Sequence, residues 1–229
     1  MKRLSIVVPV FNERTTVEES LRRVSAAPTP GYDKEVVVVD DGSTDGSGEL
    51  LVRLASGGTF VLERHLKNRG KGAAIRTGLA RVTGEAVLIQ DADLEYDPAD
   101  YAKLLAAFEA GSPVVYGSRY LGRNKVGYTI LLWGNNFLTA LINLLFGARL
   151  TDVNTCYKLF RTEIIKGLGL VSDGFDIEME LTGKTLRAGH KIVEIAIAYD
   201  PRRYAAGMKI RIRDGVRDLL AILRFRFSR

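Results

Sequence analysis

Two short apolar runs in this chain each stop at acidic residues, and this pattern limits the folds that it can adopt. The runs are Val36–Val39, followed by Asp40 and Asp41, and Val87–Ile89, followed by Gln90, Asp91, Ala92 and Asp93. Uninterrupted apolar runs of this length are typical of strands buried on both faces of a parallel sheet. Open α/β sheets bind ligands at the carboxyl ends of their strands. We therefore predict that these carboxylates face one ligand-binding edge.

Strand-like and helix-like segments alternate through the first half of the chain. The expected strands are Leu4–Phe11, Glu35–Val39, Phe60–Glu63, Ala86–Gln90 and Val114–Tyr116. The expected helices are Thr15–Ser25, Asp45–Ala55, Lys71–Arg81 and Pro98–Glu109. This alternation implies right-handed crossovers between parallel strands. The expected fold class is therefore α/β, with a Rossmann-like, mostly parallel sheet flanked by helices.

Length and cysteine content indicate the broad class of protein. With 229 residues, 46% of them hydrophobic, the chain can form one large domain or one domain with an appendage. The single cysteine, Cys156, excludes an internal disulfide bond, and no apolar signal segment precedes Ile6. We therefore expect a cytoplasmic, reducing compartment. His65 and His190 lack ligand-like spacing, so no zinc site is expected.

The segment Tyr128–Ala148 is almost entirely apolar and is long enough by residue count to span a bilayer. Its polar residues lie toward one side of a helix, and two glycines interrupt the run. These residues are Asn135, Asn136, Thr139, Asn143, Gly134 and Gly147. We therefore expect a helix that packs on the domain or lies at a membrane interface, rather than a transmembrane span.

The end of the chain is predicted to be a basic amphipathic helix over residues 211–229. Residues 200–229 contain nine Lys and Arg against three acids, which already equals the net charge of +6 of the whole chain. The apolar residues that share one helical face are Ile212, Val216, Leu219, Leu220, Leu223 and Phe227. This face predicts either lipid contact or packing on the core, and the basic charge favours an anionic membrane surface over ordinary solvation. Nucleic acid is not an expected partner, because no recognition motif is present.

The loop after the first expected strand carries an acid toward the same sheet edge. The strand breaks at Pro9 and is followed by Asn12 and Glu13. A carboxylate there can accept hydrogen bonds from a ribose or a base. The alternative is that Asn12 caps the next helix, with Glu13 in its first turn. Ser43 and Asp45 have a similar alternative role as caps of the following helix.

Two further segments have the chemistry of a diphosphate site. Lys71 lies between Gly70 and Gly72, immediately before a predicted helix, as expected for a neighbour of a pyrophosphate. The spacing is not that of a P-loop, which argues against a P-loop kinase or ATPase. Asp91 and Asp93 offer hard oxygen ligands to Mg²⁺ or Mn²⁺, and such a cation usually carries a diphosphate. Together these segments indicate a nucleotide-dependent transferase.

The ordered set of motifs resembles the family 2 glycosyltransferases with the GT-A fold. The set comprises Val8–Glu13, Val39–Asp45, Gly70–Gly72 and Asp91–Asp93. The likeness continues through Gly117–Tyr120, Asp152–Lys158 and Phe175–Glu178, as in the branch that makes dolichyl- or polyprenyl-phosphate sugars. It extends from about Leu4 to about Lys209 and implies a catalytic domain over residues 1–210. Within it, residues 1–117 would form the nucleotide-sugar half and residues 118–210 the acceptor half.

The resemblance also implies roles for individual residues. The nucleoside would be held by Pro9, Glu13, Asp40 and Asp41, and the diphosphate with its Mg²⁺ or Mn²⁺ ion by Lys71, Asp91, Ala92, Asp93 and Glu95. The acceptor phosphate would lie by Arg119, with Arg123 and Lys125 as further candidates. Residues 201–209 are similar to the family's donor-closing loop, in which Arg202 and Lys209 would neutralise phosphate.

The implied reaction is the transfer of a hexose from UDP-glucose or GDP-mannose to a polyprenyl phosphate, with inversion, at the cytoplasmic face of a membrane. A lipid phosphate is ionised at neutral pH and needs no strong base. A soluble or glycan hydroxyl is the alternative acceptor; it would need a carboxylate to take its proton, with Asp152 and Asp176 as the candidates by motif. Asp176 or Glu178 could instead anchor the acceptor-side helix. A non-catalytic nucleotide-sugar binder is a third interpretation, and a homo-oligomer is left open.

Overall fold

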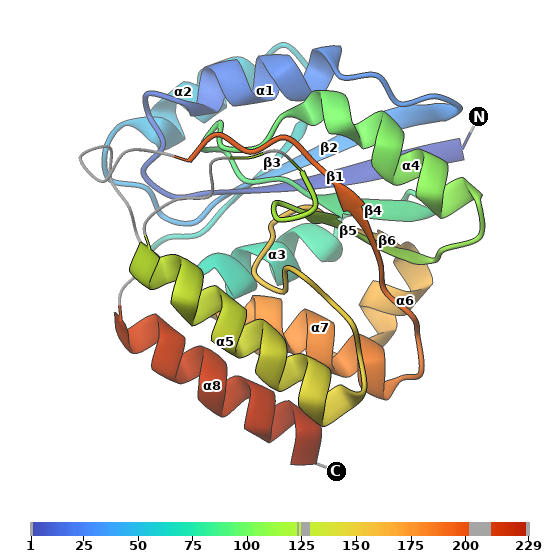
Figure 1. Cartoon of the computed structure of the whole chain (residues 1–229). Coiled ribbons are helices and arrows are strands. Elements are labelled where there is room, and N and C mark those ends of the chain that lie inside the picture. Colours follow the sequence, from blue (N-terminus) through green and yellow to red (C-terminus); the bar gives the residue numbers. More distant parts are fainter. Residues whose placement is uncertain (1, 123, 125–128, 202–211, 228–229) are drawn as a thin grey trace.

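The computed structural model describes residues 2–122, 124, 129–201 and 212–227, and the side chains of 129–131 and 212–214 are not among the parts described. A seven-stranded sheet runs through its centre in the order β3-β2-β1-β4-β6-β5-β7 (Figure 1). The strands are β1 (Lys2–Val10), β2 (Tyr32–Asp40), β3 (Val61–Arg64), β4 (Ala86–Ile89), β5 (Val114–Ser118), β6 (Lys158–Arg161) and β7 (Val193–Ala196). The predicted α/β class is confirmed.

Helices cover both faces of the sheet. They are α1 (Val17–Ala26), α2 (Ser47–Ala55), α3 (Lys71–Leu79), the short η1 (Pro98–Asp100), α4 (Tyr101–Glu109), α5 (Thr129–Phe146), α6 (Thr162–Gly167), α7 (Ile177–Arg187) and α8 (Ile212–Phe227). In Figure 1, α1, α2 and α4 lie on one face, and α3, α6 and α7 lie on the other. Helices α5 and α8 lie side by side beyond α7, so this side of the molecule has an additional helical layer.

The strand order creates a switch point beside β1. From β1 the chain adds β2 and then β3 on one side, with all pairings parallel, and then places β4 on the other side, also parallel to β1. In open α/β sheets the crevice for a ligand lies at the carboxyl ends of the strands where the order reverses. The carboxyl ends of β1 and β4 are therefore the place to look for a site.

The sequence predicted five of the strands, and the remaining two make the sheet mixed. Strand β6 is antiparallel to both β4 and β5, whereas β7 is parallel to β5. The sequence signal for both is weak, because each has only four residues, β6 begins with Lys158 and β7 contains Glu194.

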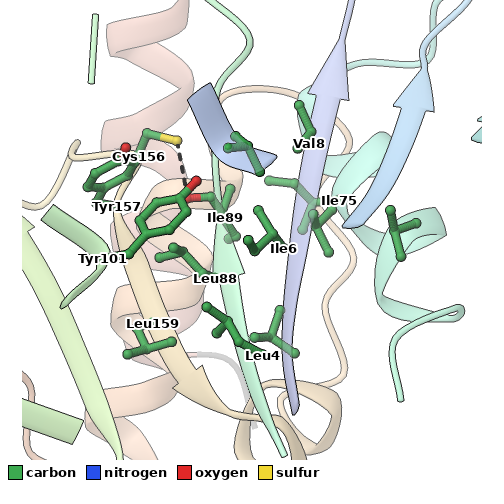
Figure 2. Packing of buried hydrophobic residues seen from close by; sticks show 14 of the residues in the cluster. Leu4, Ile6, Val8, Ile75, Leu88, Ile89, Tyr101, Cys156, Tyr157 and Leu159 are labelled. Carbon is green, nitrogen blue, oxygen red and sulfur yellow. Dashed lines mark hydrogen bonds between the residues drawn. The ribbon is translucent and has the colours of Figure 1, made fainter. Parts of the chain in front are cut away.

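Packing at the centre of the sheet fixes the backbone where β4 ends. Leu88 and Ile89 are buried in the main core cluster, in register with Ile6 and Val7 of β1, and Figure 2 shows this part of the core. The hydroxyls of Tyr101 and Tyr157 both donate to Gln90 Oε1, at 2.5 and 2.8 Å, and Gln90 Nε2 donates to the Asp91 carbonyl at 2.7 Å. The buried Gln90 is therefore held from two sides directly before the acidic segment.

Helices α5, α7 and α8 share a second apolar cluster. Its buried members include Leu138 and Ile142 of α5, Met179 of α7, and Ile222 and Phe225 of α8. Of the apolar face predicted for the end of the chain, Leu219 packs against this cluster, whereas Val216, Leu220, Leu223 and Phe227 are exposed. The stripe that packs is the neighbouring one, because α8 meets α7 and α5 through Ala221, Ile222 and Phe225. No helix in the described part of the chain is both long and apolar enough to cross a membrane.

Candidate functional site

The acidic segment after β4 forms a tight turn at the switch point. Leu94 has a φ of +66°, which is uncommon for a residue other than glycine, and Asp93 Oδ1 accepts a hydrogen bond from the Glu95 N–H at 3.2 Å. Asp91 and Asp93 are both partly exposed. The turn therefore leaves the two carboxylates within reach of a ligand.

Asp91 belongs to a chain of buried ion pairs that joins β4 to α7. Lys71 Nζ lies 2.9 Å from both carboxylate oxygens of Asp91 and 3.0 Å from Glu178 Oε1. The other oxygen of Glu178 pairs with Lys158, which is fully buried. Burial by itself would lower the pKa of the Lys71 ammonium, but the charges of Asp91 and Glu178 outweigh it and raise the pKa well above its usual value. Lys71 is therefore protonated beside Asp91.

The glycines around Lys71 allow a close approach to another loop. A Cβ atom on Gly70 or Gly72 would clash with the backbone of residues 172–174. The Gly72 and Ala73 N–H groups donate to the carbonyls of that loop, both at 3.2 Å. Two of the first backbone donors of α3 are therefore already used within the chain, and the role of this helix start as a pyrophosphate neighbour stays a prediction.

Asp41 organises the loop that leads to α3. His65 Nδ1 lies 2.6 Å from Asp41 Oδ1, which also accepts from the Arg69 N–H at 2.9 Å. Asp41 Oδ2 accepts from Asn68 Nδ2 at 2.9 Å and from the Gly70 N–H at 2.8 Å. These hydrogen bonds satisfy the buried carboxylate of Asp41. A nucleoside contact for Asp41 stays a prediction.

Asp40 is held in a comparable way. It is fully buried, and its oxygens accept from the Ser43 N–H at 3.0 Å and from Arg64 Nε at 3.2 Å. Pro9 lies in β1, in register with Val39 of β2. The structure thus brings Pro9, Asp40 and Asp41 to one edge, as predicted, although both carboxylates have partners within the chain.

The loops after β1 and β2 are joined by side-chain hydrogen bonds. Asn12, with a φ of +53°, accepts from the Thr44 N–H at 2.8 Å, and the Glu13 N–H donates to Ser47 Oγ at 2.9 Å. Asn12 as the cap of the first helix is wrong, because α1 begins later, after Thr16. The N-cap of α2 is Gly46, and no side chain caps this helix, so Asp45 as its cap is wrong; Asp45 Oδ1 instead accepts from the Ser47 N–H, at the first residue of α2, at 2.9 Å. Buried Glu13 accepts from Thr16 Oγ1 at 2.7 Å.

On the acceptor half, Arg119 and Asp152 form a bidentate pair. Arg119 Nε and one terminal nitrogen donate to the two oxygens of Asp152 at 2.7 and 2.8 Å. Glu194 accepts from the Thr151 and Asp152 N–H groups at 2.7 and 2.9 Å, and burial raises the pKa of its carboxyl despite these bonds. Asp152 itself is fully buried.

The two candidate bases therefore differ in access. Asp152 is enclosed by Arg119, so a substrate hydroxyl cannot approach it without breaking that pair. Asp176 lies half-buried at the start of α7, and its side chain does not cap the helix. Asp176 is the more accessible of the two. The expected anchoring of this helix by Glu178 is supported by its pair with Lys158.

Tyr199 connects the acidic turn to Arg119 and gave no signal in the sequence. Its hydroxyl donates to Glu95 Oε2 at 3.0 Å, and its ring lies 5.2 Å from the Arg119 guanidinium carbon. Within the described ranges, no group of three or more His, Cys, Asp or Glu side chains is arranged to hold a metal ion. The set Asp91, Asp93 and Glu95 is thus not preassembled, and Glu95 as a metal ligand stays a prediction.

Four residues that were predicted to contact phosphate lie outside the described residues. They are Arg123, Lys125, Arg202 and Lys209. The sequence pattern gave no indication that Glu178 contacts Lys71, that Lys158 contacts Glu178, or that Tyr199 contacts Glu95 and Arg119. Their partners are far away along the chain, so no local spacing could have identified them.

Residues 5–169 match the model of a protein family described as glycosyl transferase family 2. A dolichol-phosphate mannosyltransferase of Pyrococcus furiosus is 30% identical over 204 residues, which cover 87% of this chain and 57% of the relative. An undecaprenyl-phosphate 4-deoxy-4-formamido-L-arabinose transferase of Klebsiella pneumoniae is 32% identical over 171 residues, with coverages of 73% and 51%. The chain thus spans about half the length of the curated relatives that it matches.

Solved structures of glucosyl-3-phosphoglycerate synthase from Mycobacterium tuberculosis share the fold. One, in complex with UDP, has a TM-score of 0.72 and 20% identity and covers 98% of this chain and 80% of its own. Another, in complex with Mn²⁺, UDP-glucose and phosphoglyceric acid, has a TM-score of 0.71 at the same identity and coverages. At this level of identity the likeness concerns the fold alone.

Proposed function

The chain belongs to glycosyl transferase family 2, and on that basis we propose that it transfers a hexose from a nucleotide-sugar to a polyprenyl phosphate, with inversion. The observation that carries the proposal is the position of Asp91, Asp93 and Lys71 together at the carboxyl edge beside the switch point. Relatives that act on dolichol phosphate and undecaprenyl phosphate support the acceptor class.

The residues at this edge fit a divalent cation. Mg²⁺ and Mn²⁺ prefer oxygen ligands, and Mg²⁺ is usually bound by one or two carboxylates together with substrate phosphates. Asp91 and Asp93 would supply the carboxylates, and a neighbour of the same fold was solved with Mn²⁺ and UDP-glucose. A cation there would stabilise the negative charge that develops on the leaving diphosphate.

Residues of the chain itself would share this work. The Lys71 ammonium beside Asp91 would attract the diphosphate, while Arg119 would lie near the acceptor phosphate. Pro9, Glu13, Asp40 and Asp41 would contact the nucleoside, and Arg202 and Lys209 the donor phosphates. An ionised lipid phosphate attacks without a general base, which agrees with the enclosure of Asp152 by Arg119.

We further propose that the outer face of α5 and α8 lies on the cytoplasmic surface of an anionic membrane. Trp133, Phe137 and Leu144 of α5 are exposed, at helical spacing, and so are the apolar residues of α8 named above. The exposed Arg217 and Arg224 of α8 complement anionic lipid head groups. This placement would bring the site to a lipid acceptor.

A hydroxyl acceptor is the second candidate function. It is favoured by the half-buried carboxylate of Asp176, which does not cap α7 and could take a proton. In that case the donor half would work in the same way, and only the acceptor would differ.

The test is incubation of the protein with Mg²⁺ or Mn²⁺, a short polyprenyl phosphate and a panel of UDP- and GDP-sugars, followed by mass spectrometry of the lipid products. Formation of a polyprenyl-phospho-hexose from one donor supports the proposal. Slow release of nucleotide without glycolipid would refute the lipid acceptor, and the same panel with hydroxyl compounds then tests the second candidate.

A further inference from the structure

Lys71 is paired with Asp91, one of the two carboxylates proposed to bind the divalent cation. Its ammonium lies 2.9 Å from both carboxylate oxygens, so neither oxygen is open on that side while the pair is intact. Both side chains are largely shielded from solvent, with 12% of Lys71 and 21% of Asp91 exposed. A divalent cation that approaches Asp91 must therefore compete with a charge that the chain itself provides.

Glu178 gives the ammonium a second position. Its Oε1 lies 3.0 Å from Lys71 Nζ, while its Oε2 is bonded to Lys158. Lys158 is in turn held by the carbonyls of Val153, at 3.0 Å, and Thr155. Lys158 thus holds the Glu178 carboxylate in place. Glu178 can therefore keep its ion pair with Lys71 when Asp91 takes another partner.

The charges of the four paired side chains sum to zero as long as no cation is bound. Asp91 and Glu178 carry two negative charges, and Lys71 and Lys158 carry two positive ones, in surroundings that are mostly buried. A divalent cation alone would add two positive charges close to Lys71, of which the carboxylate of Asp93 offsets one, and like charges in a poorly solvated site repel strongly. A nucleoside diphosphate that arrives with the cation would compensate them.

We propose that Lys71 is an internal competitor for the divalent cation at Asp91, and that Glu178 is the positioning residue that receives its ammonium when the cation binds. The inference rests on the proposed metal site at Asp91 and Asp93 and adds a regulation of that site. It means that the free protein binds metal weakly, and that the presence of a diphosphate favours metal binding.

The test is titration of the donor-free protein with Mn²⁺, followed by electron paramagnetic resonance or calorimetry, so that no transfer reaction is needed. In Lys71→Met the competitor is gone, and Kd for Mn²⁺ should fall about tenfold or more. In Lys71→Arg the charge remains and can pair with Asp91 in a bidentate manner, so Kd should stay the same or rise. The opposite directions separate competition from a general disturbance of the site.

Two further variants complete the design. In Glu178→Gln the ammonium loses its alternative partner, so Kd for Mn²⁺ should rise by roughly threefold to tenfold. Lys184→Met is the matched control: it removes a lysine that pairs with Glu180 on the same helix α7, and it should leave Kd unchanged. A thermal unfolding curve for each variant checks the fold, and Lys71→Met decides the main question even if Glu178→Gln does not fold.

The outcomes distinguish this inference from the proposed function. If Asp91→Asn does not weaken Mn²⁺ binding, or if neither the wild type nor Lys71→Met binds Mn²⁺, the metal site itself is refuted and the inference falls with it. If Asp91→Asn abolishes binding but Lys71→Met leaves Kd unchanged or higher, the metal site stands and the competition is refuted.

Discussion

At the scale of single residues, the buried charges of this protein depend on partners that are distant in the sequence. Arg119 and Asp152 are 33 positions apart and form two hydrogen bonds with each other in a largely buried setting. The motifs pointed to both residues but predicted different roles for them: Arg119 was expected to bind the acceptor phosphate, and Asp152 was a candidate base. Their pairing makes Asp152 less accessible than Asp176, and a role of Asp152 as a base stays a prediction.

This pair predicts a large loss of stability in Arg119→Met. The substitution leaves the fully buried Asp152 carboxylate without its main counter-charge, and breaking a buried pair in this way typically costs about 3–5 kcal/mol. Urea unfolding followed by circular dichroism measures the free energy of unfolding. The control, Arg22→Met, removes an exposed partner of Glu19 and should not change it measurably. If the free energy of unfolding changes equally little in both variants, the stabilising role of the Arg119–Asp152 pair is contradicted.

At the scale of secondary-structure elements, side chains tie the strands together at the end remote from the site. Glu35 of β2 accepts from Ser5 Oγ of β1 at 2.5 Å, and from the N–H and hydroxyl of Thr83 at 2.8 and 2.7 Å, in the segment that leads to β4. Burial by itself would raise the pKa of the Glu35 carboxyl, but the hydrogen bonds from Ser5 and Thr83 outweigh it and lower the pKa. This link should make part of the stability dependent on pH.

The sign of that dependence follows from the lowered pKa. Above the unfolded value, near 4.5, the folded state gains from the ionised Glu35, and this gain is lost as the pH falls through the folded pKa. The free energy of unfolding of the wild type should therefore exceed that of Glu35→Gln at pH 7. The difference should shrink when urea titrations are repeated at progressively more acidic pH. A difference that is constant, or that grows on acidification, would contradict the role of Glu35.

The exposed face of α5 and α8 makes a separate prediction at the same scale. Trp133 is the only tryptophan of the chain, and 72% of it is exposed on this face. Vesicles of phosphatidylglycerol and phosphatidylcholine should shift its fluorescence to shorter wavelengths, and added salt should weaken the effect. Leu220→Glu should weaken vesicle binding by about tenfold or more, because one apolar side chain no longer enters the interface.

The matched control for the membrane prediction is Val52→Glu. Val52 is an exposed apolar residue of α2, on the opposite side of the sheet from α8 (Figure 1). It should leave vesicle binding unchanged. Equal binding by Leu220→Glu and the wild type, or no fluorescence shift at all, would show that this face does not contact lipid.

At the scale of the whole molecule, the alternation of apolar runs and amphipathic helices was enough to predict the α/β class and the first five strands. It could not predict the antiparallel β6 or the edge strand β7, because strands of four residues with a charged member carry little periodicity. The motifs predicted that Asp40, Asp41, Asp91 and Lys71 lie at one edge of the sheet, and the structure places them there. The contacts of Glu178 and Tyr199 arise only from tertiary packing, so local spacing gave no indication of them.

The central claim is that the carboxyl edge after β4 is the donor site of a glycosyltransferase. It is tested most directly by the rate of polyprenyl-phospho-hexose formation in Asp93→Asn, compared with the wild type and with Asp97→Asn. Asp97 is an exposed neighbour in the sequence that caps η1, and asparagine can keep that bond. We expect Asp93→Asn to lose transfer while circular dichroism and thermal unfolding stay unchanged, and Asp97→Asn to keep it. Retained turnover in Asp93→Asn would contradict the assignment of this edge as the donor site.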